Sequence, residues 1–182
     1  MKRILLTTTL LSALAFTACK DDKKTESSNS DSTVTEQEMT SKEEQNRTNT
    51  SKLTFKTDKD EQLANSYFNL KDALVKTDAT SAKQAANALL KNLRDETQVD
   101  LAKEIAENED NIEVQRTAFS KLSALLAPVF SKQITSGELY KQYCPMAFDN
   151  EGAFWFSREK EIMNPYFGDK MLHCGSIQET IQ

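Results

Sequence analysis

The sequence predicts an all-α fold: an antiparallel helical bundle followed by a loop-rich C-terminal segment that is dense in aromatic and cysteine residues. Three observations support this prediction. Apolar side chains recur at helical spacing from residue 58 to residue 131. The polar breaks between these stretches are short, as they are in up-and-down bundles. No glycine-rich phosphate-binding motif and no long β-branched run occurs in the chain. We therefore expect one helical-bundle domain over 56–182, which is long enough for a single core.

Four helices account for the apolar periodicity. The expected helices cover about 59–76, 80–94, 99–106 and 111–131. The stripe that predicts the first helix consists of Leu63, Tyr67, Leu70 and Leu74. In the fourth helix Pro128 lies in the last turns. Proline lacks a backbone N–H and clashes with the preceding turn, so we expect the helix to bend or end there.

The N-terminus has the features of a secretory signal. A basic start, Lys2-Arg3, precedes the apolar stretch 4–15, which is shorter than the about 20 residues that span a bilayer. The following Phe16-Thr17-Ala18-Cys19 resembles a bacterial lipobox. This resemblance implies cleavage before Cys19 and attachment of lipid to its sulfur and amine. Residues 1–18 are then a lipoprotein signal peptide, and Cys19 attaches the mature protein to the membrane.

A polar segment separates this anchor from the helices. Residues 20–52 contain only Val34 and Met39 as apolar side chains, too few to offset the entropy of ordering. We therefore assign 19–55 to a disordered tether. Its first residues, Lys20-Asp21-Asp22, resemble the surface-export signal of lipoproteins in one Gram-negative lineage, although a charged linker start explains them equally well. The expected location is the outer membrane of a bacterial envelope, with the domain facing either the surface or the periplasm.

Charge and composition exclude several function classes. Residues 53–182 carry 15 basic and 20 acidic side chains, whereas nucleic-acid binding requires a basic surface. We therefore expect no nucleic-acid partner. General acid–base catalysis usually draws on histidine or paired carboxylates, and the chain has one histidine. Thiol oxidoreductases typically use a Cys-x-x-Cys pair, which the chain lacks. We expect a binding or interaction protein and not an enzyme.

Soft metal ligands gather near the C-terminus. Residues 137–182 contain all four glycines, eight of the fourteen aromatic residues, the only histidine and both cysteines other than Cys19. Thiolate and thioether sulfurs select copper(I) among the common metal ions. The candidate ligands are Cys144, Met146, Met171, His173 and Cys174.

A disulfide is the competing interpretation of the same cysteines. After lipidation of Cys19, the mature chain has two cysteines in a compartment that permits oxidation. A bridge between Cys144 and Cys174 would close a loop of about 30 residues and contribute roughly 3 to 4 kcal/mol in the chain-entropy model. A third interpretation joins the first two: reduction would expose two thiolates, giving a redox-gated metal site.

Three short segments in this region carry a family resemblance: 144–147 (Cys-Pro-Met-Ala), 164–168 (Asn-Pro-Tyr-Phe-Gly) and 171–175 (Met-Leu-His-Cys-Gly). Within Asp60–Ile181 they resemble an uncharacterised family of envelope domains. Its members are stand-alone lipoproteins or C-terminal extensions of periplasmic adaptor subunits of copper and silver efflux systems. The resemblance implies copper(I) as the ligand and heavy-metal efflux components as partners. The alternative function is a disulfide-stapled structural or protein-interaction module of the envelope that holds no metal.

Cys19→Ala should abolish lipid attachment, because the lipobox resemblance places the modified sulfur there. Lipid attachment is measured as labelled palmitate incorporated into the protein by cells that express it. Cys144→Ala serves as the matched control and should keep the label. Label in the Cys19→Ala protein would contradict the lipoprotein assignment.

Overall fold

The structure, a computed structural model, describes residues 52–182. These residues belong to one compact unit, Thr48–Gln182. The predicted signal peptide 1–18, the lipidation site Cys19 and most of the tether 19–55 lie outside the described residues. Within 52–182, no helix has the length and apolar character needed to cross a membrane.

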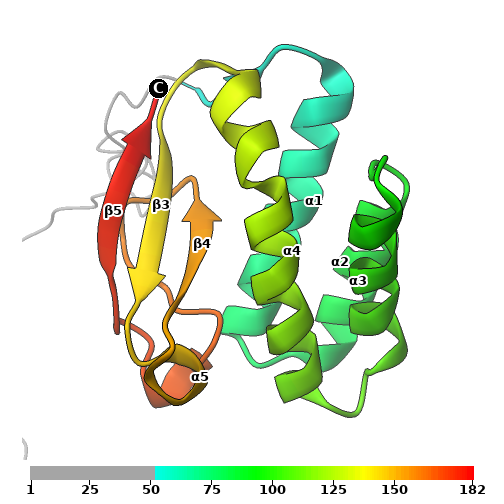
Figure 1. Cartoon of the computed structure of the whole chain (residues 1–182), viewed down its shortest axis with the longest axis vertical. Helices are drawn as coiled ribbons and strands as arrows, with labels where there is room; N and C mark the ends of the chain where they lie inside the picture. The colour runs from blue at the N-terminus through cyan, green and yellow to red at the C-terminus, as the bar shows by residue number, and fades with distance from the viewer. Residues whose placement is uncertain (1–51) are drawn as a thin grey trace, which may run out of the picture. The chain divides into compact units, whose positions relative to one another are not determined.

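The described chain alternates helices with short strands, and the helices and the larger sheet lie side by side (Figure 1). The elements are β1 (Thr54–Phe55), α1 (Asp58–Val75), α2 (Ala79–Leu90), α3 (Glu96–Glu107), α4 (Ile112–Gln133), β2 (Ile134–Ser136), β3 (Leu139–Cys144), α5 (Ala147–Asn150), β4 (Ala153–Ser157), a single 3-10 turn η1 (Gly168–Lys170) and β5 (Ser176–Ile181).

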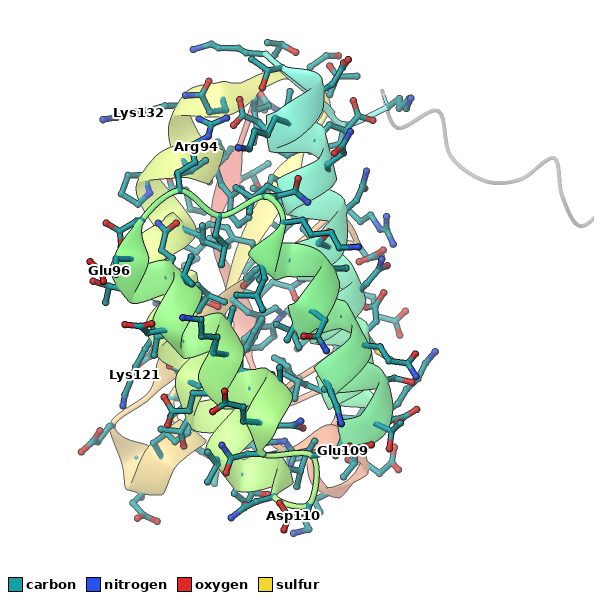
Figure 2. All side chains as sticks on the ribbon, turned by 90° about the vertical axis from the view of Figure 1, so that its right-hand side faces the viewer. Arg94, Glu96, Glu109, Asp110, Lys121 and Lys132 are labelled. Atoms are coloured by element: carbon teal, nitrogen blue, oxygen red, sulfur yellow. The ribbon has the colours of Figure 1, made fainter. Side chains whose placement is uncertain are left out.

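The first four helices follow the predicted apolar periodicity closely. Each of them begins after a residue whose side chain accepts a hydrogen bond from the backbone N–H three residues later, which satisfies an otherwise unpaired donor. These N-caps are Thr57, Asp78, Asp95 and Asn111. The buried stripes of α1 and α4 face each other, and Tyr67 stacks on Phe119 with ring centroids 5.1 Å apart. Figure 2 shows the molecule from the side of α2 and α3, where polar side chains cover the outer face of the helices.

Helix α4 does not end at Pro128. It continues to Gln133 with the proline inside it. The missing proline N–H leaves the carbonyl of Ala124 without its usual backbone donor. Both Ala124 and Pro128 are exposed, so water can bind that carbonyl.

The all-α prediction is wrong, because residues 134–182 contain the strands β2, β3, β4 and β5. The larger sheet is antiparallel, three-stranded and ordered β4-β3-β5, and a separate two-stranded sheet pairs β1 with β2. The sequences of β3 (Leu-Tyr-Lys-Gln-Tyr-Cys) and β4 (Ala-Phe-Trp-Phe-Ser) contain no β-branched residue. Their strand signal comes from aromatic side chains, which pack well on a pleated surface. The fold class is therefore mixed α and β.

Strand β4 connects the sheet to the helices. Phe156 packs against Tyr67 and Phe130, with ring centroids 6.3 and 5.1 Å away. The N–H of Phe156 donates to the Tyr67 hydroxyl at 3.1 Å, and Tyr67 in turn donates to Ser123, whose hydroxyl binds the Phe119 carbonyl. Burial raises the pKa of Tyr67 well above its usual value, although these hydrogen bonds partly oppose the shift, so the hydroxyl stays protonated.

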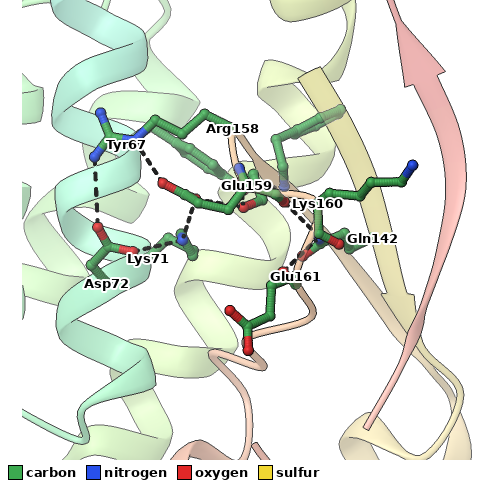
Figure 3. A network of polar contacts seen from close by, with 10 residues as sticks. Tyr67, Lys71, Asp72, Gln142, Arg158, Glu159, Lys160 and Glu161 are labelled. Atoms are coloured by element: carbon green, nitrogen blue, oxygen red, sulfur yellow. Dashed lines mark hydrogen bonds and ion pairs between the residues drawn. The ribbon is translucent and has the colours of Figure 1, made fainter. Parts of the chain in front are cut away.

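A buried lysine joins helix α1 to the segment after β4 (Figure 3). Lys71 Nζ lies 2.6 Å from an Asp72 carboxylate oxygen and 3.3 Å from one of Glu159, and its side chain is 3% exposed. From the sheet, the Gln142 amide donates to the carbonyl oxygens of residues 159, 160 and 161. Desolvation acts to raise the pKa of Glu159, but Lys71 and the surrounding donors bring it below its usual value. This segment therefore starts from a fixed position over the sheet.

Tyr67→Phe should lower the free energy of unfolding by about 1–3 kcal/mol, because it leaves the buried Phe156 N–H without an acceptor. Urea unfolding measures this. Ser131→Ala is the control: it removes an exposed hydroxyl that bonds a helix carbonyl of α4 and leaves the Phe156 bond intact, and should change stability by less than about 0.5 kcal/mol. Equal losses in the two variants would contradict the role assigned to the β4 edge.

Candidate functional site

The two cysteines of the folded part meet at one end of the larger sheet. Cys144 is the last residue of β3, and Cys174 lies two residues before β5. Their Sγ atoms are 3.0 Å apart and are not bonded. Pairing of Tyr143 with Ser176 in the antiparallel register brings the two together. Gly175 allows this approach, because a Cβ there would lie 2.8 Å from the Tyr143 carbonyl oxygen.

The two thiols differ in exposure, and the partly exposed one has a raised pKa. Cys144 is 0% exposed, and Cys174 is half-buried. The hydrogen bond to Cys144, together with desolvation and repulsion from that sulfur, raises the pKa of the Cys174 thiol to about 11. At neutral pH, the Cys174 thiol is therefore protonated and shares a hydrogen bond with the Cys144 sulfur, in which either sulfur can donate. Together they form a dithiol pair in which Cys174 is partly exposed to solvent and Cys144 is buried.

A buried asparagine holds Cys174 in place. Asn164 is 0% exposed, and its Nδ2 donates to the Cys174 carbonyl at 2.8 Å. Its Oδ1 accepts the N–H of Tyr166, and its own N–H donates to the Leu172 carbonyl. The side chain and backbone of Asn164 thus fix the turn in which the Cys174 N–H donates to the Met171 carbonyl at 3.0 Å. That turn holds Met171 and Cys174 at its two ends.

A buried arginine attaches the Asn164 segment to the helices. Arg116 of α4 is 2% exposed, and its Nε donates to the Pro165 carbonyl at 2.9 Å. Its Nη2 donates to the carbonyl of Leu74 and the hydroxyl of Thr77, and Nη1 binds Glu113 at 2.7 Å. All three guanidinium nitrogens therefore have partners, as a buried cation requires. The position of Cys174 depends on this chain of contacts from α4 through Pro165 and Asn164.

A groove of about 600 Å³ contains both candidate methionines. Met146 and Met171 line it together with Phe148, Tyr166 and Phe167. Each methionine is within three residues of a cysteine along the chain, and Met146 is 46% exposed. The wall beside Met146 is an unusual turn, in which the non-glycine residues 148–150 have φ values of 52°, 56° and 72°. Such left-handed backbone is costly, and the edge-to-face contact of Phe148 with Tyr166 helps to hold it.

His173 does not join the cysteine pair. It is exposed, and its Nδ1 lies 2.9 Å from the Ile162 carbonyl oxygen. Because a carbonyl only accepts, Nδ1 carries a proton in this contact. Among residues 52–182, no three histidine, cysteine or carboxylate side chains are grouped so that they could hold a metal ion. The structure therefore brings Cys144 to Cys174 and Met146 to Met171, and places His173 apart.

The sequence did not identify Asn164 and Arg116, the buried residues that position Cys174. In the sequence, 164–168 stood out only for its family resemblance, and the role of Asn164 in holding Cys174 was not foreseen. Arg116 also escaped notice, because a charged residue in an amphipathic helix is normally assigned to the exposed face. Its position one turn before Phe119 on the apolar side of α4 was the available signal.

Comparisons with known proteins bear mainly on the helices. Residues 63–137 match the model of a family described as a protein of unknown function (DUF3347). The matched stretch runs from within α1 to the residue after β2, so it ends before both cysteines. It supports a domain of unknown function in this part of the chain. The search of curated proteins and the search of solved structures found no match.

Asn164→Ala should lower the free energy of unfolding of the reduced protein by about 2–5 kcal/mol, because it leaves the Cys174 carbonyl and the Tyr166 N–H without partners. Urea unfolding in reducing buffer measures the loss. His173→Ala is the control: it removes a side-chain bond to the same region from an exposed position and should change stability by less than about 0.5 kcal/mol. A loss of free energy of unfolding no larger than that of the His173→Ala control would show that the turn is stable without the Asn164 side chain.

Proposed function

We propose that this chain is an envelope-anchored lipoprotein whose folded domain binds a soft metal ion, copper(I), at Cys144 and Cys174. The observation that carries the proposal is the 3.0 Å approach of the two Sγ atoms. These cysteines are 30 residues apart in the chain and are held together by the sheet register and by Asn164. A site that positions two thiols in this way can present two thiolates to one ion.

The donor set favours copper(I) over zinc. Structural zinc sites are tetrahedral and use four cysteine, histidine or carboxylate ligands. In the described part of the chain, the cysteine pair has no third ligand of these types beside it. The nearby donors along the chain are the thioethers of Met146 and Met171, which suit copper(I). We assign Cys144 and Cys174 as the ligands, with Met146 or Met171 as the supplementary donor.

The proposal also includes the location and the partners. Lipidated Cys19 would anchor the domain to the outer membrane, and the polar tether would let it reach components of a heavy-metal efflux system. Its role there would be to bind and pass on the ion, not to catalyse a reaction.

A second candidate, the disulfide-stapled interaction module, is favoured by the same sulfur contact. Burial of Cys144 and the apposed Cys174 suit a structural bridge as well as a metal site. In that case the methionines serve as ordinary packing and groove residues. The two candidate functions differ in whether the reduced protein binds copper(I).

The reduced chain should remove copper(I) from a chelating dye of micromolar affinity under anaerobic conditions. Cys19→Ala in all proteins leaves Cys144 and Cys174 as the two thiols. Thiolate-to-copper charge-transfer absorbance should appear with one equivalent of metal, and Cys144→Ser and Cys174→Ser should both lose it.

Methionine and histidine variants test the ligand set. Met146→Leu combined with Met171→Leu should weaken binding by about tenfold, whereas His173→Ala should leave it unchanged. Failure of the reduced parent protein to compete with the dye would leave the disulfide-stapled module as the function.

A further inference from the structure

The dithiol pair is asymmetric toward solvent. Cys144 lies at the end of the central strand β3, is paired with Ala153 of β4 and is 0% exposed. Cys174 lies in the connection before the edge strand β5 and is half-buried. Both backbone groups of Cys174 are engaged, its N–H with Met171 and its carbonyl with Asn164, so its backbone is held beside Cys144. A molecule approaching from solvent therefore meets Cys174 first.

We propose that Cys174 is the thiol–disulfide exchange site of this protein, through which the disulfide of a low-molecular-weight thiol reversibly oxidises the pair, with Cys144 as the internal resolving thiol. The buried sulfur lies 3.0 Å behind the accessible one, which is the arrangement that exchange requires. This role differs from that of an inert staple, because the bridge would be opened and closed from outside.

The chemistry balances with the small disulfide as oxidant. Cys174 loses its proton to water, and its thiolate attacks one sulfur of the small disulfide, whose S–S bond breaks and releases one thiolate, which takes up a proton from water. Cys144, after losing its proton, attacks Cys174 Sγ and displaces the second small thiolate, which takes up a proton. The two protein thiols are oxidised to one disulfide, and the small disulfide is reduced to two thiols. In the reverse direction, a small thiolate attacks Cys174 Sγ and Cys144 leaves.

The exchange has a regulatory consequence for the proposed function, because the bridged form has no thiolate to offer copper(I). This regulatory consequence rests on the proposed function, whereas the exchange itself does not.

Reaction with oxidised glutathione tests the proposal without metal. The full chain carrying Cys19→Ala is compared with the same chain carrying in addition Cys144→Ala or Cys174→Ala, and adducts are followed by mass spectrometry. At the end of the reaction, the protein with both cysteines should have lost two hydrogens and should retain no adduct. The Cys144→Ala protein should gain one glutathione on Cys174. The Cys174→Ala protein should react at least about tenfold more slowly, because Cys144 is buried.

Two controls keep the result interpretable if a variant folds poorly. In denaturant both single-cysteine proteins should react at the same rate, which assigns the difference to the fold. In the two-cysteine protein, acid quenching at early times should trap glutathione on Cys174 and not on Cys144. Equal reaction of the two cysteines in the folded protein, or trapping on Cys144, would overturn the proposal. Failure of copper(I) binding would leave these outcomes unchanged, so the two proposals fail separately.

Discussion

The docking of strand β4 on helices α1 and α4 is the contact on which the rest of the described structure depends. Phe156 inserts among the aromatic rings of Tyr67 and Phe130, and its backbone N–H is bound by the buried Tyr67 hydroxyl. An edge strand normally presents unpaired backbone groups to solvent. Here one of these groups is satisfied by a helix side chain, so the sheet is fixed to the helices by a directional bond as well as by apolar packing. Strands β3 and β5 take their places by pairing outward from β4.

Two buried cations then determine the path of the segment that follows β4. Lys71 of α1 binds Glu159 near its start, and Arg116 of α4 binds the Pro165 carbonyl further along. Both side chains are almost fully buried, so removing their partners would leave an unpaired cation in the interior, which is costly. Gln142, the cross-strand partner of Trp155, donates to the carbonyls near the start of the segment, and Tyr166, just beyond the second attachment, contacts the Trp155 indole with ring centroids 5.8 Å apart.

The thiol pair is the product of this arrangement. Cys144 is positioned by strand pairing and Cys174 by Asn164, so neither depends on a bond between the sulfurs to stay in place. A preorganised pair of this kind lowers the entropic cost both of closing a disulfide and of binding an ion with two thiolates. The proposed metal binding and the proposed thiol–disulfide exchange would thus draw on one geometry, and the redox state of the pair would decide between them.

The sequence by itself determined the four helices, because apolar periodicity and N-cap residues are local signals; it also marked the C-terminal segment as chemically distinct and singled out Cys144 and Cys174. The strands were not recognised, since β3 and β4 are short and lack β-branched residues. Their extended conformation is stabilised by cross-strand partners and by Tyr67, all distant in sequence. Only the tertiary structure decided that Met146 and Met171 line one groove, that His173 stands apart, and that Asn164 and Arg116 position the thiols. These are contacts between residues far apart in the chain, and the spacing of residues along a chain carries no information about such distances.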